Sequence, residues 1–156
     1  MSKVRFRLVN EREFETFLEE EKVRYAHSIA KNRHVSFEEA LKSGDKQINE
    51  LFSEGMHTPG HYVFLVEGEE QVVGNVWICI NEESRRSFLY NIFIHENQQG
   101  KGFGTAALKE AESWLKERGI QSFGLHVFAH NTGAKRLYER LGFEVTSVNM
   151  TKNLSS

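Results

Sequence analysis

The sequence predicts an α/β fold, and three observations along the chain lead to this prediction. Two long runs near the start and two further runs in the last third have the apolar spacing of amphipathic helices. Three β-type runs bounded by turn residues lie between them. No repeat, low-complexity tract or linker divides the chain, so we expect one domain over residues 1–156.

The first third predicts one strand and two helices. Residues 3–9, KVRFRLV, alternate charged and apolar side chains as a half-exposed strand does. Asn10 then caps a helix with Glu13 reaching back, and the SFEE sequence from Ser36 begins a second helix that continues through Gly44. The apolar stripes of these helices are Phe14, Phe17, Leu18, Tyr25 and Ile29 in the first and Phe37, Leu41, Ile48, Leu51 and Phe52 in the second.

The rest of the chain predicts a meander followed by alternating helices and strands. Strands over 61–68, 70–81 and 85–95 are joined by short turns, which favours antiparallel pairing. A helix over 105–118, which Gly119 ends, is followed by a strand over 121–129. A short helix over 131–143 begins near Asn131 and stops at Gly142, and a last strand covers 144–154.

Composition argues against several classes of protein. A formal net charge of −2 gives no reason to expect a nucleic-acid or membrane-surface partner. The N-terminus lacks the apolar core of a signal peptide, and no run approaches the roughly 20 apolar residues that span a bilayer. Cys79, the single cysteine, lies in the apolar run VVGNVWICI, where we expect a buried structural thiol and, with no disulfide partner, a cytoplasmic protein. His57 and His61 have helical i, i+4 spacing, but Pro59 between them forbids that helix, so we expect no metal.

Three of the twelve glycines, Gly100, Gly102 and Gly104, stand directly before an amphipathic helix. A helix N-terminus preceded by glycines can hold an anion, because its N–H groups are unpaired and the backbone can approach closely. The P-loop pattern fails because no Gly-Lys-Ser/Thr occurs. A dinucleotide pattern, with Ala107 in its last place, lacks the acidic residue expected roughly 20 positions on. A helix that merely starts at glycines is the structural alternative.

A different signature fits this segment. Residues 99–104, QGKGFG, resemble the Q/R-x-x-G-x-G/A signature of the GCN5-related N-acetyltransferase (GNAT) family. The preceding FLYNIFIHENQ resembles the central strand of that family. Downstream, NTGAKRLYERLGFE matches the pattern N-x-x-A-x-x-L-Y-x-x-x-G-F at the expected distance. The resemblance covers residues 75–148, and its strength is that two motifs lie in register.

The resemblance implies a mixed, mostly antiparallel sheet, flanked by helices and splayed between its fourth and fifth strands, with acetyl-CoA in the split. The main chain of Ile92, Phe93 and Ile94 would pair with the pantetheine arm, and the N–H of Ile94 would stabilise the oxyanion. Lys101 would add Coulombic attraction, or be a solvated loop lysine. Backbone N–H groups from Gly100 to Thr105 would hold the pyrophosphate. The cofactor-binding segment would thus consist of Gln99, Gly100, Lys101, Gly102, Phe103, Gly104 and Thr105.

The same resemblance assigns two residues of the second motif. Tyr138 would be the general acid that protonates the departing thiolate, since its ordinary pKa of ~10 lies above that of a thiol. The alternative is a core tyrosine on the apolar stripe of its helix. Asn131 would contact the cofactor and also cap the helix.

The general base and the acceptor remain open at this stage. Many family members carry a carboxylate on the central strand, but this chain has Asn91 there. Ordered water, Glu82, Glu83, His61 or His126 could accept the proton. We expect an enzyme that acetylates a primary amine of a small molecule or peptide. The alternative is a weakly active acyl-CoA-binding sensor or interaction domain, and the family resemblance leaves a homodimer open.

Overall fold

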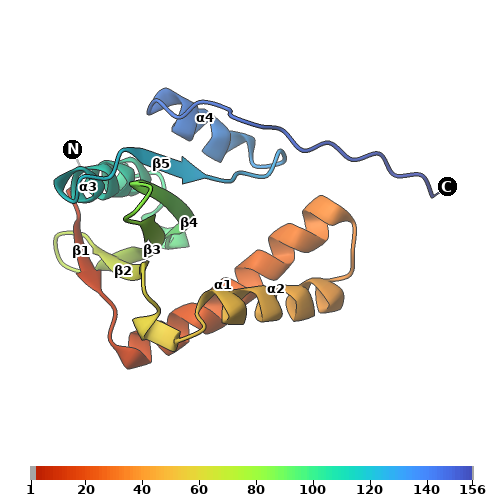
Figure 1. The fold of residues 1–156 in the computed structure, drawn as a ribbon, viewed down its shortest axis with the longest axis horizontal. Coiled ribbons are helices and arrows are strands. Elements are labelled where there is room, and N and C mark those ends of the chain that lie inside the picture. Colours follow the sequence, from red (N-terminus) through yellow and green to blue (C-terminus); the bar gives the residue numbers. More distant parts are fainter. Residues whose placement is uncertain (1–2, 156) are drawn as a thin grey trace.

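A five-stranded sheet in the order β1-β2-β3-β4-β5 organises the computed structural model, which describes residues 3–155 (Figure 1). The strands are β1 (Arg5–Leu8), β2 (His61–Glu67), β3 (Val72–Asn81), β4 (Arg86–Ile94) and β5 (Ser122–Leu125). The helices are α1 (Glu11–Arg33), α2 (Phe37–Leu51), α3 (Phe103–Glu117) and α4 (Thr132–Arg140), with short 3-10 turns at Gly55–His57 and Glu96–Gln98. Among these described residues, no helix is long and apolar enough to cross a membrane.

The sheet is antiparallel from β1 to β4 and parallel only where β5 meets β4. That parallel contact is short, because it pairs Arg86–Leu89 with Ser122–Leu125 and leaves the second half of β4 without a neighbour on that side. The expected fold class, a mixed and mostly antiparallel sheet that splays between the fourth and fifth strands, is confirmed.

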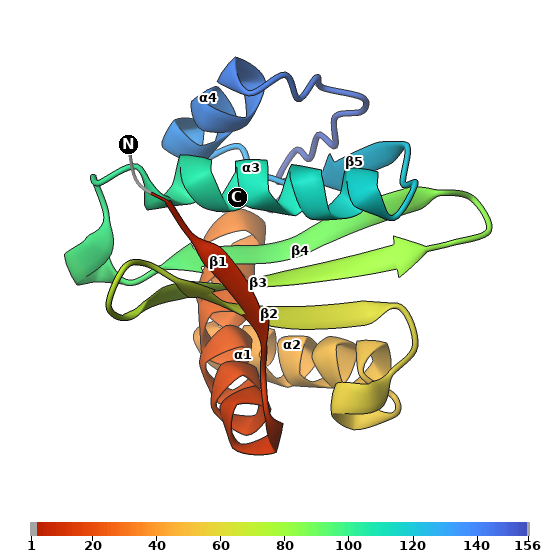
Figure 2. The same cartoon turned by 90° about the vertical axis from the view of Figure 1, so that its left-hand side faces the viewer.

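The helices lie on both faces of the sheet (Figure 2). One face packs on α3 through a core that includes Val76, Ile78 and Leu108. The other packs on α1 and α2 through an aromatic core around Phe17, Phe52 and Trp77. Successive side chains of β3 alternate between these cores, as the pleat of a strand requires.

Local signals in the sequence set most of the helix ends. Asn10 forms the expected reciprocal capping box with Glu13, and Ser36 accepts a hydrogen bond from the main-chain N–H of Glu39. Helix α2 runs unbroken through Gly44. Glycine fits this position because a side chain there would meet the ring of Tyr25 at 3.0 Å. Glycines with positive φ, Gly119 (75°) and Gly142 (101°), follow α3 and α4 as expected.

The predicted last strand is wrong. Residues 144–154 form no strand, although their side chains alternate, because no other strand lies beside them to share backbone hydrogen bonds. This segment leaves α4 and runs away from the sheet (Figure 1). Other boundaries also differ: β5 ends at Leu125 rather than at 129, α4 ends at Arg140 rather than at 143, and α3 begins at Phe103, two residues before the predicted start.

Candidate active site

The split between β4 and β5 forms a small cavity of about 140 Å³. It opens where β4 continues past Leu89 and β5 has ended. Its lining comes from both strands, from the loop after β5 and from α4, and consists of Leu89, Tyr90, Asn91, Ile92, Leu125, His126 and Tyr138. The cavity thus joins the central strand β4 to Tyr138 of the second sequence motif, and the residues of the glycine segment do not line it.

The exposed half of β4 offers main-chain groups to this split. His95 donates its N–H to the carbonyl of Val73 on β3 at 2.8 Å. Because N–H groups alternate sides along an antiparallel strand, Ile92 and Ile94 direct theirs away from β3, toward the split. Phe93 faces β3 with its main chain, and its ring lies 4.1 Å beneath the guanidinium of Arg24.

The glycine segment turns the chain from β4 into α3. Gly100 (φ 79°) and Gly102 (φ 85°) both adopt the left-handed conformation that favours glycine. Gly102 is the N-cap of α3 and has no side chain, so the first N–H groups of the helix have no side-chain cap. Phe103 packs its ring into the core against Val73 and the turn at Gly68. It therefore contributes only its main chain to this turn.

Two polar side chains brace the glycine segment. The amide nitrogen of Gln99 donates to the main-chain oxygen of Ile94 at 2.9 Å, which ties the loop to the end of β4. Lys101 lies 3.4 Å from the side-chain oxygen of the buried Gln98. The first contact gives Gln99 a role in holding the shape of the loop.

Helix α4 brings Tyr138 to the split, whereas Asn131 at the start of the helix does not line the cavity. Tyr138 is half-buried against the core and lines the cavity beside Asn91 and Ile92. Burial raises the pKa of its phenol, so the hydroxyl keeps its proton at neutral pH. Asn131 caps α4, accepting from the N–H of Ala134 at 3.3 Å, as the sequence predicts.

The proposed proton acceptors fall in different places. Glu82 and Glu83 lie in the turn at the far end of β4, roughly 25 Å from Ile94 at ~3.3 Å per residue. His126 lines the split itself. Asn91 on β4 donates to the side-chain oxygen of Asn75 on β3 at 2.7 Å, so a neutral amide pair stands at this point of the sheet.

His61 belongs to a structural group on the other face. Its Nδ1 accepts the indole N–H of Trp77 at 3.0 Å, and its Nε2 lies 3.6 Å from the sulfur of Cys79. Burial lowers the pKa of His61 and raises that of Cys79, so both groups stay neutral at pH 7. Cys79 is half-buried, and its raised pKa disfavours the thiolate that a nucleophile would need.

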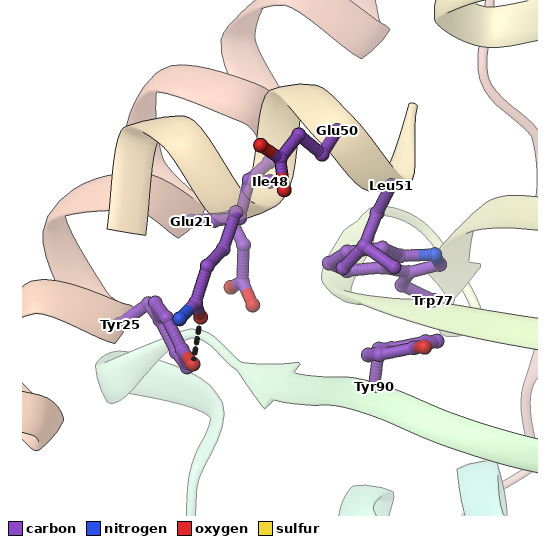
Figure 3. A pocket seen from close by; sticks show the side chains of 8 residues that line it. Glu21, Tyr25, Ile48, Glu50, Leu51, Trp77 and Tyr90 are labelled. Atoms are coloured by element: carbon purple, nitrogen blue, oxygen red, sulfur yellow. Dashed lines mark hydrogen bonds between the residues drawn. The ribbon is translucent and has the colours of Figure 1, made fainter. Parts of the chain in front are cut away.

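A second and larger cavity, of about 370 Å³, lies on the α1/α2 face of the sheet (Figure 3). Helix α1 contributes Glu21 and Tyr25, and the sheet contributes Trp77 and Tyr90. The rest of the lining comes from α2 and consists of Gln47, Ile48, Glu50 and Leu51. Tyr25 donates its hydroxyl to Gln47 at 2.6 Å and so joins the two helices. We name this space the α1/α2 cavity.

Glu21 is the buried charge of this cavity. It is 6% exposed, and Figure 3 shows its carboxylate directed between Tyr25 and the two rings on the sheet. Its recorded ion pair is with Arg24, at 3.3 Å, and uses one oxygen. Burial raises the pKa of Glu21 to about 7, against the opposing effect of Arg24.

A bulge in β4 places one residue, Tyr90, in the lining of both cavities. Trp77 pairs with Asn91 and Ile78 pairs with Leu89, so Tyr90 is an extra residue on β4. Its ring stacks on Trp77 with centroids 4.5 Å apart, inside the α1/α2 cavity, and Tyr90 also lines the split.

Sequence reasoning missed Glu21, Trp77 and Tyr90. A signal for Glu21 was present, because it falls on the stripe of Phe14 and Phe17 at helical spacing, where a charge is out of place. The ring pair gave no signal of its own, since it depends on the register of β3 against β4 and on the bulge.

Comparisons with known proteins agree with this geometry. The profile of the acetyltransferase (GNAT) family matches residues 13–143. The uncharacterized N-acetyltransferase YycN of Bacillus subtilis (strain 168) is 32% identical over 145 residues, 91% of this chain and 93% of its own. A crystal structure of YycN covers 99% of this chain and 100% of its own, with a TM-score of 0.94 and 30% identity. The spermidine N(1)-acetyltransferase of Vibrio cholerae is 30% identical over 131 residues, 81% of this chain and 75% of its own.

Proposed function

The chain belongs to the acetyltransferase (GNAT) family, and from that premise we propose that it transfers the acetyl group of acetyl-CoA to a primary amine. The observation that carries the proposal is the split in the sheet. The outward main-chain groups of β4 and the phenol of Tyr138 meet there. The uncapped start of α3 follows β4 in the chain and lies beside α4, where a Cβ at Gly104 would be 3.9 Å from Leu137.

Acetyl-CoA fits this split by its chemistry. Its diphosphate is an anion, and the N–H groups at residues 100–105 begin a helix whose dipole favours negative charge. Its pantetheine arm carries amides that can pair with Ile92 and Ile94 as a short added strand. The thioester would then lie beside the N–H of Ile94 and near Tyr138.

The reaction we propose is direct attack within a ternary complex. The neutral amine nitrogen forms a bond to the thioester carbon while the carbonyl electrons move to oxygen, where the N–H of Ile94 stabilises them. When the carbonyl re-forms, the C–S bond breaks and Tyr138 gives its proton to sulfur. The second proton of the nitrogen returns to Tyr138, so the products are the amide and CoA.

The acceptor is, by this proposal, a primary amine of a small molecule or peptide. Relatives with named acceptors support the amine class: the spermidine N(1)-acetyltransferases of Vibrio cholerae and of Escherichia coli (strain K12) are 30% and 31% identical to this chain. A structure of the Vibrio cholerae spermidine enzyme in complex with CoA and spermine shares the fold, with a TM-score of 0.67.

An amine panel with the purified chain tests the proposal. We expect CoA thiol to be released from acetyl-CoA only when an acceptor amine is added, and the acetylated amine to be detected by mass. Tight binding of acetyl-CoA without acetylation of any amine would favour the acyl-CoA sensor. Absence of acetyl-CoA binding would reject both functions.

A further inference from the structure

We propose that the α1/α2 cavity holds the acceptor as an aliphatic ammonium, with Glu21 contacting the reacting nitrogen and the rings of Trp77 and Tyr90 contacting its stem (Figure 3). This inference rests on the proposed acetyl transfer. It adds a charge class for the substrate and a proton acceptor that the sequence motifs do not supply.

The charges around the cavity favour a cation. Glu21 and Glu50 both line it, and no cationic side chain does among the described residues. Arg24, which pairs with Glu21 at 3.3 Å, also contacts Glu20 at 3.8 Å and so divides its guanidinium between the two carboxylates. Its Nε is buried without a hydrogen-bond partner. The carboxylate of Glu21 is therefore incompletely neutralised, although a buried charge needs a partner.

The walls of the cavity suit an alkyl chain that ends in an ammonium group. Trp77 and Tyr90 form a stacked pair, with ring planes 22° apart, that presents aromatic surface to the space. Aromatic faces attract cations within about 6 Å of the ring centroid. Ile48 and Leu51 add apolar surface from α2. A volume of about 370 Å³ lies in the range of small-molecule sites, roughly 300–1,000 Å³.

The cavity also lies next to the reacting strand. Tyr90 lines both this cavity and the split, and Arg24 links Glu21 to Phe93 on β4. An amine held at Glu21 therefore approaches β4 from the face opposite α3. Glu21 would take one proton from the ammonium before attack, leaving a neutral nitrogen, and would later release that proton to solvent. Its raised pKa, from burial, suits this exchange near neutral pH.

Calorimetric binding of n-pentylamine and of its uncharged counterpart 1-pentanol tests the inference. We expect pentylamine to bind the parent protein and the variant Glu21→Gln to bind it at least ~10-fold more weakly, about 1.4 kcal/mol by the affinity scale. Pentanol should bind weakly to both proteins. Glu20→Gln is the matched control, since Glu20 lies on the same helix and also faces Arg24, but does not line the cavity.

Equal pentylamine affinity in the parent and in Glu21→Gln would overturn the inference, as would equal binding of pentanol and pentylamine. Acetyl-CoA affinity, measured on the same samples, separates this failure from that of the proposed function. If acetyl-CoA binds and amines are acetylated but Glu21→Gln changes nothing, only the role of the α1/α2 cavity is lost.

The C-terminal segment, residues 144–155, carries an independent inference. Its large apolar side chains lie in solvent, with Val148 71%, Met150 91% and Leu154 87% exposed. These three share one face of an extended chain, because they are separated by even numbers of residues. The segment has a strand pattern and no strand partner, and it runs away from its own sheet (Figure 1).

Strand β5 has an outer edge that could accept such a segment. It is the last strand of the sheet, so among the described residues no strand pairs with its outer edge. An unpaired edge is a template for another chain. We infer that the C-terminal segment of one copy pairs with β5 of a second copy, and that the exchange is reciprocal. A two-fold dimer then satisfies both edges and both segments at once.

Sedimentation of the full chain tests this exchange. We expect a dimer for the parent and a monomer for Val148→Asp, which places a charge on the apolar face of the segment. Leu8→Asp, at another exposed apolar position on the opposite edge strand, should remain dimeric. A monomeric parent at ~50 μM, far above the Kd of stable complexes, or a Val148→Asp protein that stays dimeric, would contradict the exchange.

Discussion

On the split side of β4, the polar groups are main-chain N–H groups and one phenol. They come from two stretches that are each continuous in sequence, β4 with the glycine segment that follows it, and α4 with Tyr138. On the α1/α2 side they are side chains from four separate elements, α1, α2, β3 and β4. The first arrangement suits a ligand that every family member shares, because glycine spacing and a helix start reproduce it in any sequence. The second can change one side chain at a time, which suits an acceptor that differs among relatives.

The largest effect we expect on the split side comes from Tyr138→Phe. The ring keeps its contact with Phe143 and with the core, so the fold and acetyl-CoA affinity should be retained. Loss of a general acid typically lowers rates by about 10²- to 10⁴-fold, and we expect kcat to fall within that range. The measurement is kcat beside the acetyl-CoA Kd of the same variant. An unchanged kcat would make Tyr138 a packing residue.

A second test enlarges Gly104, at the start of α3. A Cβ placed there meets only Leu137, at 3.9 Å, so the folded protein has room for it. A bound diphosphate has less room, because it must approach the same N–H groups. We expect Gly104→Ala to weaken acetyl-CoA binding slightly and Gly104→Val to weaken it by about 100-fold, some 2.7 kcal/mol. Thermal unfolding of the same variants should change little.

Normal acetyl-CoA affinity in Gly104→Val would mean that the diphosphate lies elsewhere. The split side of β4 would then not be the diphosphate site, and the glycines at 100 and 102 would be explained by the left-handed turn alone.

The contrast between the two sides also explains what the sequence could predict. Asn10, Ser36 and Gly119 act on residues within one turn of themselves, so helix ends were predicted closely. The glycine segment and Tyr138 were found because each lies in a contiguous motif. Glu21 and Tyr90 are 69 positions apart, and only the packing of α1 on the sheet and the bulge in β4 bring them together.

The predicted last strand shows the same limit from another direction. The alternation of side chains in residues 144–154 indicates a strand, but it does not indicate which strand edge that segment would pair with. Pairing is a tertiary property, and within this chain nothing pairs with that segment in the described residues.

On the α1/α2 side, Glu21→Gln should stabilise the empty protein at high pH. The folded pKa of about 7 lies above the ordinary 4.5, so the folded state binds this proton more tightly than the unfolded state. Stability from this group is therefore greatest below pH 4.5 and is lost as the pH rises from 4.5 through 7. Glutamine cannot ionise. We expect the variant to gain about 1–2 kcal/mol over the parent at pH 8, and little at pH 5.

The charged and titratable groups around Glu21 affect how its stability contribution depends on pH. Arg24 on α1 opposes the effect of burial on Glu21, and burial raises the pKa of the Tyr90 phenol, which therefore stays neutral at pH 8. Urea unfolding of both proteins at pH 5 and pH 8 gives the comparison. A destabilised Glu21→Gln protein at pH 8 would show that the pair with Arg24 stabilises the fold, and that Glu21 is a structural residue.

The smallest effect we expect comes from Gln99, whose side chain spans from the glycine segment to β4. Gln99→Met keeps the length of the side chain but removes the donor that reaches the oxygen of Ile94. A hydrogen bond of this kind contributes about 1 kcal/mol, so acetyl-CoA affinity should fall about 5-fold as the loop becomes less ordered. Because Gln99 acts through Ile94 and not on the reacting atoms, kcat at saturation should hold. Gln99→Glu should lose more affinity, since its carboxylate would repel the carbonyl oxygen that the amide now contacts. Equal affinity in all three proteins would mean that the segment around Gly100 and Gly102 keeps its shape unaided, and that the split side of β4 depends on main chain alone.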